Sequence, residues 1–109
     1  MAIVEAVVTE SASIYDKFNT FVWTLAGGVD TAVAIQAGLS GDKSVQSSGG
    51  VTIEGSNDGV NYFTLNDTGG LPLVFAGPGI KQILELTRFI RPTGFVAPVV
   101  VTLLGKRQF

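Results

Sequence analysis

Short stretches in which apolar and polar residues alternate, separated by glycine-rich turns, dominate this sequence. Residues 51–54 and 60–65 form the clearest pair, and Ser56-Asn57-Asp58-Gly59 between them has the residue types of a tight turn. A period of two is typical of a half-buried β-strand, and many short strands between turns indicate a sandwich or barrel. We therefore expect an all-β fold, a jelly-roll-type β-sandwich of about eight short antiparallel strands.

The same alternation places the remaining expected strands and predicts no helix. They lie at residues 3–10, 20–25, 33–37, 71–75, 80–86, 89–92 and 99–104. A short edge strand is expected between loops at residues 40–44 and 47–50. Phe21, Trp23 and Leu25 share one face of their strand, and we expect that face to meet the core.

The last expected strand, residues 99–104, barely alternates between apolar and polar residues. A strand that is apolar on both faces is normally buried on both faces. One face meets the core, so Val100, Thr102 and Leu104 on the other face should meet a loop, the N-terminal strand or another subunit. We expect another chain to cover these residues and Phe109.

Histidine and cysteine are both absent from the sequence. Their absence removes the usual general base, the usual transition-metal ligand and the thiolate nucleophile. The acidic residues are scattered, so a facing pair of carboxylates for glycosidase chemistry is not expected. Asp58 and Asp67 lie in glycine-containing loops without the clustered acidic spacing of a calcium site, so we expect them to form turns. We predict no enzymatic activity, no cofactor and no metal ion.

Charged residues make up only 15% of the 109 residues, against about 25% in an average soluble domain. Two interpretations stay open: the surface is polar but uncharged, or part of the apolar excess lies on a face that a partner covers. The net charge of −2 argues against a nucleic-acid partner. No apolar run is long enough to cross a membrane, and Met1 to Glu5 lack the basic start of a signal peptide, so we expect synthesis in the cytoplasm. The length suits a single domain, residues 1–109.

Basic residues gather in the last part of the chain. Residues 81–109 contain one acidic residue, Glu85, and five basic residues, which are Lys81, Arg88, Arg91, Lys106 and Arg107. Strand pairing would interleave these charges with the acidic residues of the first part of the chain. Alternatively, the basic residues after Glu85 form a patch that docks an acidic protein surface, since arginine pairs well with carboxylates. Both interpretations stay open.

Residues 51–63 resemble the strand, Ser-x-Asp-Gly-x-x-aromatic turn and second strand of discoidin-like jelly rolls. Arg88-Phe89-Ile90-Arg91-Pro92, followed by the apolar strand that ends near Gly105, resembles the closing strands of the same fold. Short chains that combine this hairpin, an Arg-x-x-Arg-Pro segment and a final Val/Leu strand are similar to tailed-bacteriophage head decoration (cement) proteins.

This resemblance implies a homo-oligomer, a dimer or trimer, on the exterior of a virion capsid. Its partner would be the major capsid protein, whose neighbouring subunits it would clamp together. Arg88 or Arg91 is then expected to pair with a capsid carboxylate. Two alternatives stay open: a tail or baseplate accessory domain, and a carbohydrate-binding β-sandwich module in which Tyr62 is the exposed aromatic. The sequence matches none of the loop residues with which carbohydrate-binding relatives contact sugars.

Overall fold

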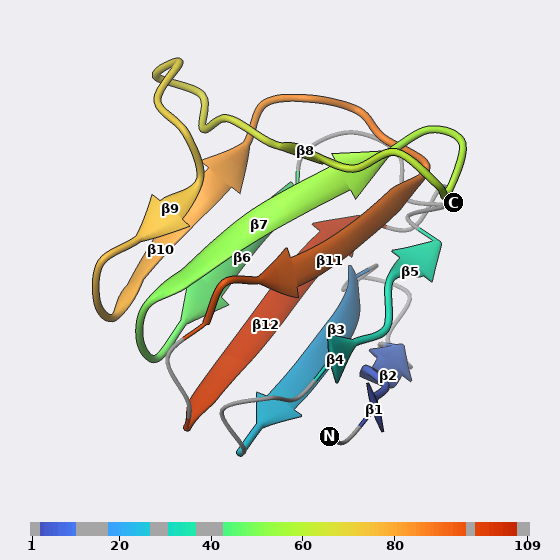
Figure 1. The fold of residues 1–109 in the computed structure, drawn as a ribbon, viewed down its shortest axis with the longest axis vertical. Helices are drawn as coiled ribbons and strands as arrows, with labels where there is room; N and C mark the ends of the chain where they lie inside the picture. The colour runs from blue at the N-terminus through green and yellow to red at the C-terminus, as the bar shows by residue number, and fades with distance from the viewer. Residues whose placement is uncertain (1–2, 11–17, 27–30, 37–42, 96–97, 107–109) are drawn as a thin grey trace.

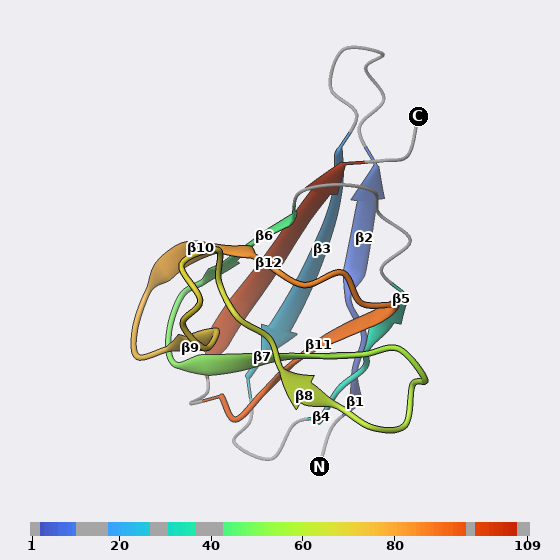
Figure 2. The ribbon, with the colours of Figure 1, turned by 90° about the horizontal axis from the view of Figure 1, so that it is seen from above.

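Two β-sheets pack face to face in the computed structural model, with the apolar side of each sheet turned inward (Figures 1 and 2). The structure describes residues 3–10, 18–26, 31–36, 43–95 and 98–106. No helix occurs among these residues, so the predicted all-β sandwich is confirmed. The same part of the chain offers no helix that could span a membrane.

The larger sheet, here called the β12 sheet after its central strand, has the order β10-β6-β12-β3-β2. Its strands are β2 (Val7–Glu10), β3 (Phe18–Leu25), β6 (Lys43–Ser47), β10 (Gly79–Ile83) and β12 (Val99–Lys106). Every pairing in it is antiparallel, and β12 lies between β3 and β6. Strands from near both ends of the chain therefore belong to this one sheet, with the last strand, β12, at its centre.

The second sheet, here called the β7 sheet, has the order β5-β11-β7-β8, and β9 also pairs with β7. Its strands are β5 (Ile35–Gln36), β7 (Val51–Ser56), β8 (Phe63–Thr64), β9 (Val74–Phe75) and β11 (Phe89–Thr93). From β3 onward the chain passes repeatedly between the two sheets, and its last strand is inserted between two earlier ones. This winding is the one expected of a jelly roll.

The N-terminal segment packs on its own domain. The predicted strand over residues 3–10 is divided into β1 (Ile3–Val4), which pairs in parallel with β4 (Thr31–Ala32), and β2, which pairs with β3. Glu5 and Ala6 between β1 and β2 belong to no strand, so the expectation of one continuous antiparallel strand is wrong here.

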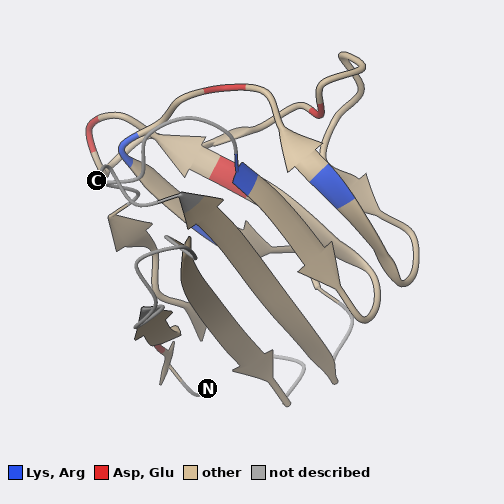
Figure 3. Cartoon of the chain, turned by 180° about the vertical axis from the view of Figure 1, so that it is seen from behind, with Lys and Arg blue, Asp and Glu red and all other residues tan. Residues whose placement is uncertain are grey.

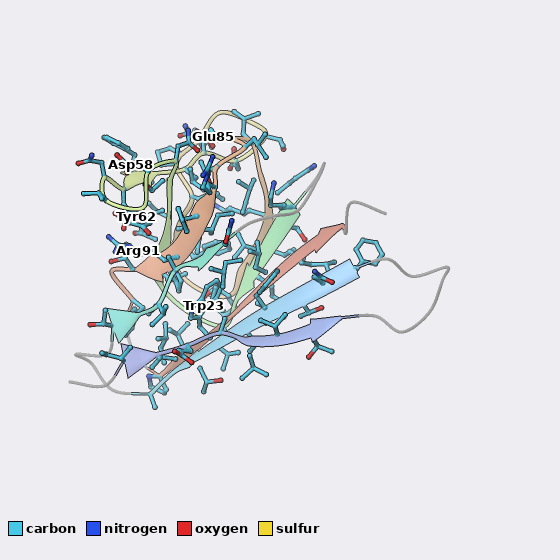
Figure 4. The ribbon with its side chains drawn as sticks, turned by 90° about the vertical axis from the view of Figure 1, so that its right-hand side faces the viewer. Trp23, Asp58, Tyr62, Glu85 and Arg91 are labelled. Carbon is cyan, nitrogen blue, oxygen red and sulfur yellow. The ribbon has the colours of Figure 1, made fainter. Side chains whose placement is uncertain are left out.

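The core lies between the sheets and is apolar. Phe21, Trp23 and Leu25 of β3 are buried, as their shared face predicts. The Trp23 indole N–H donates to the backbone carbonyl of Val33 at 2.9 Å, which satisfies the one polar group that this side chain brings into the core. Figure 4 shows Trp23 between the layers.

Several strand predictions are wrong in extent. A short edge strand was expected between loops at residues 40–44 and 47–50. Instead, β6 extends into both expected loops, lies inside the β12 sheet and pairs with both β10 and β12. Its polar residues Lys43 and Ser47 are buried, so their polarity is a wrong guide to the position of β6 in the sheet. In the predicted strand 33–37, the backbone N–H of Val33 donates to Val4 and its carbonyl accepts from the Trp23 indole, so Val33 belongs to no strand. Ala37 lies outside the described residues.

The hairpin after residue 51 is confirmed, with a shorter second strand than expected. Of the expected second strand, residues 60–65, only β8 (Phe63–Thr64) pairs with β7, because residues 57–62 form a loop. Only β9 is strand in the expected segment 71–75, and the segment expected at 80–86 becomes β10. With these short pieces the described residues contain twelve strands rather than about eight.

Gly55 in β7 lies where no side chain fits. A Cβ atom there would be 2.7 Å from the Thr87 hydroxyl oxygen and 2.8 Å from Cδ2 of the core residue Leu65. We expect Gly55→Ala to destabilise the protein by about 1–3 kcal/mol, the usual cost of overpacking a core. Gly77→Ala is the matched control, because nothing lies within 4 Å of its Cβ position. Urea unfolding of both variants tests this, and equal stabilities would contradict the packing.

Candidate binding surfaces

The two faces of β12 have different environments. Val99, Val101 and Leu103 point into the core and are at most 1% exposed. On the opposite face, Val100 is 40% and Leu104 is 37% exposed. The prediction that a second layer covers this face is not met by the described part of the chain. Cover by another molecule stays a prediction.

The exposed residues of β12 belong to a larger surface, the outer face of the β12 sheet. The strand registers place fourteen residues on it, in two rows that cross all five strands and two shorter rows. One row runs through Val7, Val22, Thr102, Gln46 and Ile80, and a second through Thr9, Thr20, Leu104, Ser44 and Gln82. The shorter rows are Thr24 with Val100, and Phe18 with Lys106, whose side chain lies outside the described part of the structure.

None of the described side chains on this outer face is charged. Figure 3 shows the consequence: β3 and the body of β12 carry neither acidic nor basic residues. The cores of protein–protein interfaces are likewise depleted of charged residues. An open sheet that faces water more often carries charged residues on its solvent side. The outer face is therefore suited to contact another protein.

The candidate residues near the C-terminus are only partly described. Lys106 ends β12 opposite Phe18, but its side chain lies outside the described part of the structure. Arg107 and Phe109 lie outside it altogether. The expected patch of these residues with the two arginines near β11 stays a prediction.

Arg91 is already engaged by its own chain. Its Nε donates to Oε1 of Glu54 at 3.1 Å, and its guanidinium carbon lies 3.7 Å from the centre of the Tyr62 ring. Figure 4 shows Arg91 and Tyr62 together on the side of the molecule away from β2 and β3. By contrast, Arg88 is exposed, and no interaction of its side chain occurs among the described residues. Of the two candidates, Arg88 is the one available to a partner.

A pocket of about 420 Å³ lies beside the 57–62 loop. Residues of the loop, of β8 and of the segment before β11 line it, among them Asn57, Asp58, Phe63, Glu85 and Thr87. The Glu85 carboxylate accepts bonds from the backbone N–H and the side-chain amide of Asn66, at 2.8 and 2.6 Å. Much of the polar lining is thus used to hold the walls together.

Asp58 organises the loop that forms one wall of this pocket. One of its carboxylate oxygens accepts the backbone N–H groups of Val60 and Asn61, both at 2.8 Å, and the Ser56 hydroxyl at 2.9 Å. The other accepts the Asn61 amide at 2.9 Å. Gly59 completes the turn with φ of 76°, a conformation that favours glycine. Turn formation, the role expected of Asp58, is confirmed by these bonds. Within the described chain, no group of three or more potential metal-ligating side chains comes together.

Two neighbouring aromatic residues beside the pocket differ in exposure. Tyr62, the exposed aromatic of the carbohydrate-binding alternative, is half-buried with Arg91 over its ring. Phe63, in β8 at the sheet edge, is 71% exposed. Tyr15, the other tyrosine, lies outside the described residues.

Comparisons with models of protein families, with curated proteins and with solved structures found no match for this chain.

Four hydrogen bonds to the Asp58 carboxylate lower its pKa, first those from the backbone of Asn61 and Val60, then those from the side chains of Asn61 and Ser56. The unfolded chain therefore binds a proton more readily, so this contribution to stability is present above about pH 3.9 and is lost as the pH falls below it. We expect Asp58→Asn to be less stable than the native protein at neutral pH, and the difference to shrink in acid. Urea unfolding of both proteins from neutral pH to below about pH 3.9 measures the stability difference and its change with pH. A difference independent of pH would contradict this account of Asp58.

Proposed function

We propose that this chain is a virion structural protein that binds the outside of an assembled phage capsid and cements neighbouring capsid subunits. The outer face of the β12 sheet carries this proposal, because it combines exposed apolar residues with uncharged threonine and glutamine over two full rows of strands. The similarity of the hairpin and the closing segment to head decoration proteins supplies the kind of partner, the major capsid protein.

The physical effect of such a protein is simple. A copy that binds only the assembled shell shifts the equilibrium toward assembly by mass action. Each copy needs only a modest interface, because many copies act on one shell. The rows of the outer face that carry no charged residue can be desolvated without leaving an unpaired charge behind, which is the main cost that a charged surface would carry.

Arg88 complements the outer face in this proposal. It precedes β11 in the β7 sheet, and its backbone N–H donates to the Asn57 side chain at 3.2 Å. Its exposed guanidinium is the candidate for a salt bridge with a capsid carboxylate. Arg91 contributes indirectly, because its pairing with Glu54 holds β11 against β7.

Binding to undecorated heads tests the proposal. Purified protein is mixed with heads of its own phage assembled without it, and we expect stoichiometric binding and a higher temperature of head disruption. Val100→Asp introduces an unpaired charge into the contact and should weaken binding by about tenfold or more, the effect of 1.4 kcal/mol or more.

Val60→Asp is the matched control. Val60 is exposed in the 57–62 loop, away from the β12 sheet, so the same substitution there should leave binding unchanged. Thermal unfolding of both variants separates lost binding from lost folding. Native protein that binds no head at all would overturn the proposal. In that case, binding to phage tails or to a glycan array would favour one of the two alternatives from the sequence.

A further inference from the structure

The edges of the two sheets differ in how well they are protected against pairing with another strand. The β7 sheet ends in β5 and β8, which are only two residues long. In the β12 sheet, β10 lies at one edge and β2 at the other. An edge strand exposes unpaired backbone groups that attract another strand, and proteins normally blunt such edges by making them short, charged or covered.

The β10 edge is protected in two ways. Lys81 points to the inner side of the sheet, in register with Val45, and its ammonium lies 5.3 Å from the centre of the Phe75 ring. An inward-pointing lysine is a recognised way of preventing strand addition. The 66–67 loop also bonds the end of this edge, through a bridge between Asp67 and Ile83.

Neither device is found along residues 7–9 of the β2 edge in the described part of the chain. No described strand pairs with β2 on the side away from β3, and Figure 2 shows β2 at the margin of its sheet. Val7 is 68% exposed on the outer face, and Val8 is 53% exposed on the inner side. Residues 7–9 contain no proline, glycine or charge, and the one charged residue of β2, Glu10, stands at its end in register with Asn19. Among the described residues, Val7 to Thr9 are therefore open to pairing, with a valine on each side of the strand.

We propose that β2 pairs with β2 of a second copy of this chain, antiparallel and with Val8 opposite Val8. This register places Val7 opposite Thr9 of the second copy, so outer residues meet outer residues. It also places Glu10 opposite Ala6, whereas a parallel pairing in register would set Glu5 on Glu5 and Glu10 on Glu10. Like charges directly opposite each other destabilise a strand pair, so the sequence favours the antiparallel arrangement.

This pairing would extend the proposed capsid-binding face. The rows that begin at Val7 and Thr9 would continue into the Thr9 and Val7 rows of the second copy, which gives one uncharged sheet surface shared by two chains. The dimer rests on the edge alone and forms in solution, so it stands or fails independently of head binding.

Disulfide trapping tests the proposal in the full chain, which has no cysteine of its own. Directly opposed residues of an antiparallel pair have Cβ atoms close enough for a disulfide after small adjustments. We expect oxidised Val8→Cys protein to form a covalent dimer several-fold more efficiently than Ile80→Cys protein, whose cysteine is similarly exposed on the β10 edge. Equal trapping at the two edges would overturn the proposal.

Sedimentation velocity provides the second measurement. Native protein should show a concentration-dependent dimer, and Val7→Lys, which adds the charge that protected edges carry, should remain monomeric with an unchanged circular dichroism spectrum. A native protein that stays monomeric at the highest soluble concentration would overturn the proposal. So would a folded Val7→Lys protein that dimerises like the native one.

Discussion

The pairing of β12 with both β3 and β6 is the contact on which the rest of the structure depends. It connects the C-terminal strand to an early and a middle strand of the chain, and so closes the β12 sheet. Because side chains alternate along a strand, the same pairing places Val101 and Leu103 in the core and Val100 and Leu104 outside it. One register therefore fixes both the most buried residues of this sheet and the surface that we propose as its binding face.

The two sheets are specialised in different ways. The β7 sheet carries the Arg91–Glu54 pair and ends near the Asp58 loop, whose hydrogen bonds stabilise an otherwise irregular edge. The outer face of the β12 sheet lacks charges among its described side chains, and no described strand pairs with β2 at one of its edges. The charged residues are thus unevenly distributed, and the described uncharged surface lies on one sheet. This distribution favours a face that a partner covers over a uniformly polar surface.

The apolar and polar pattern predicted the strands that bury one face along their whole length. It failed where neighbouring strands determine whether a residue is buried. The β3 and β12 strands and the start of β7 follow from the sequence. Cover over the outer face of β12 was also expected from the sequence, and the described residues do not provide it. The internal position of β6 does not follow, because Lys43 and Ser47 are polar residues buried by neighbouring strands. The rows of the outer face could not be predicted either, since they depend on registers between strands far apart in the chain. For the same reason, the sequence did not reveal the pairing of Arg91 with Glu54 and Tyr62.

The central claim is that the outer face of the β12 sheet is the surface in contact with the capsid. Thiol labelling of a Val100→Cys variant tests it directly, since the chain contains no other cysteine. We expect the reagent to label this variant readily in solution and much more slowly once it is bound to heads, and to label a Val60→Cys variant equally in both states. Head-bound Val100→Cys protein that is labelled as fast as the free protein would contradict the claim.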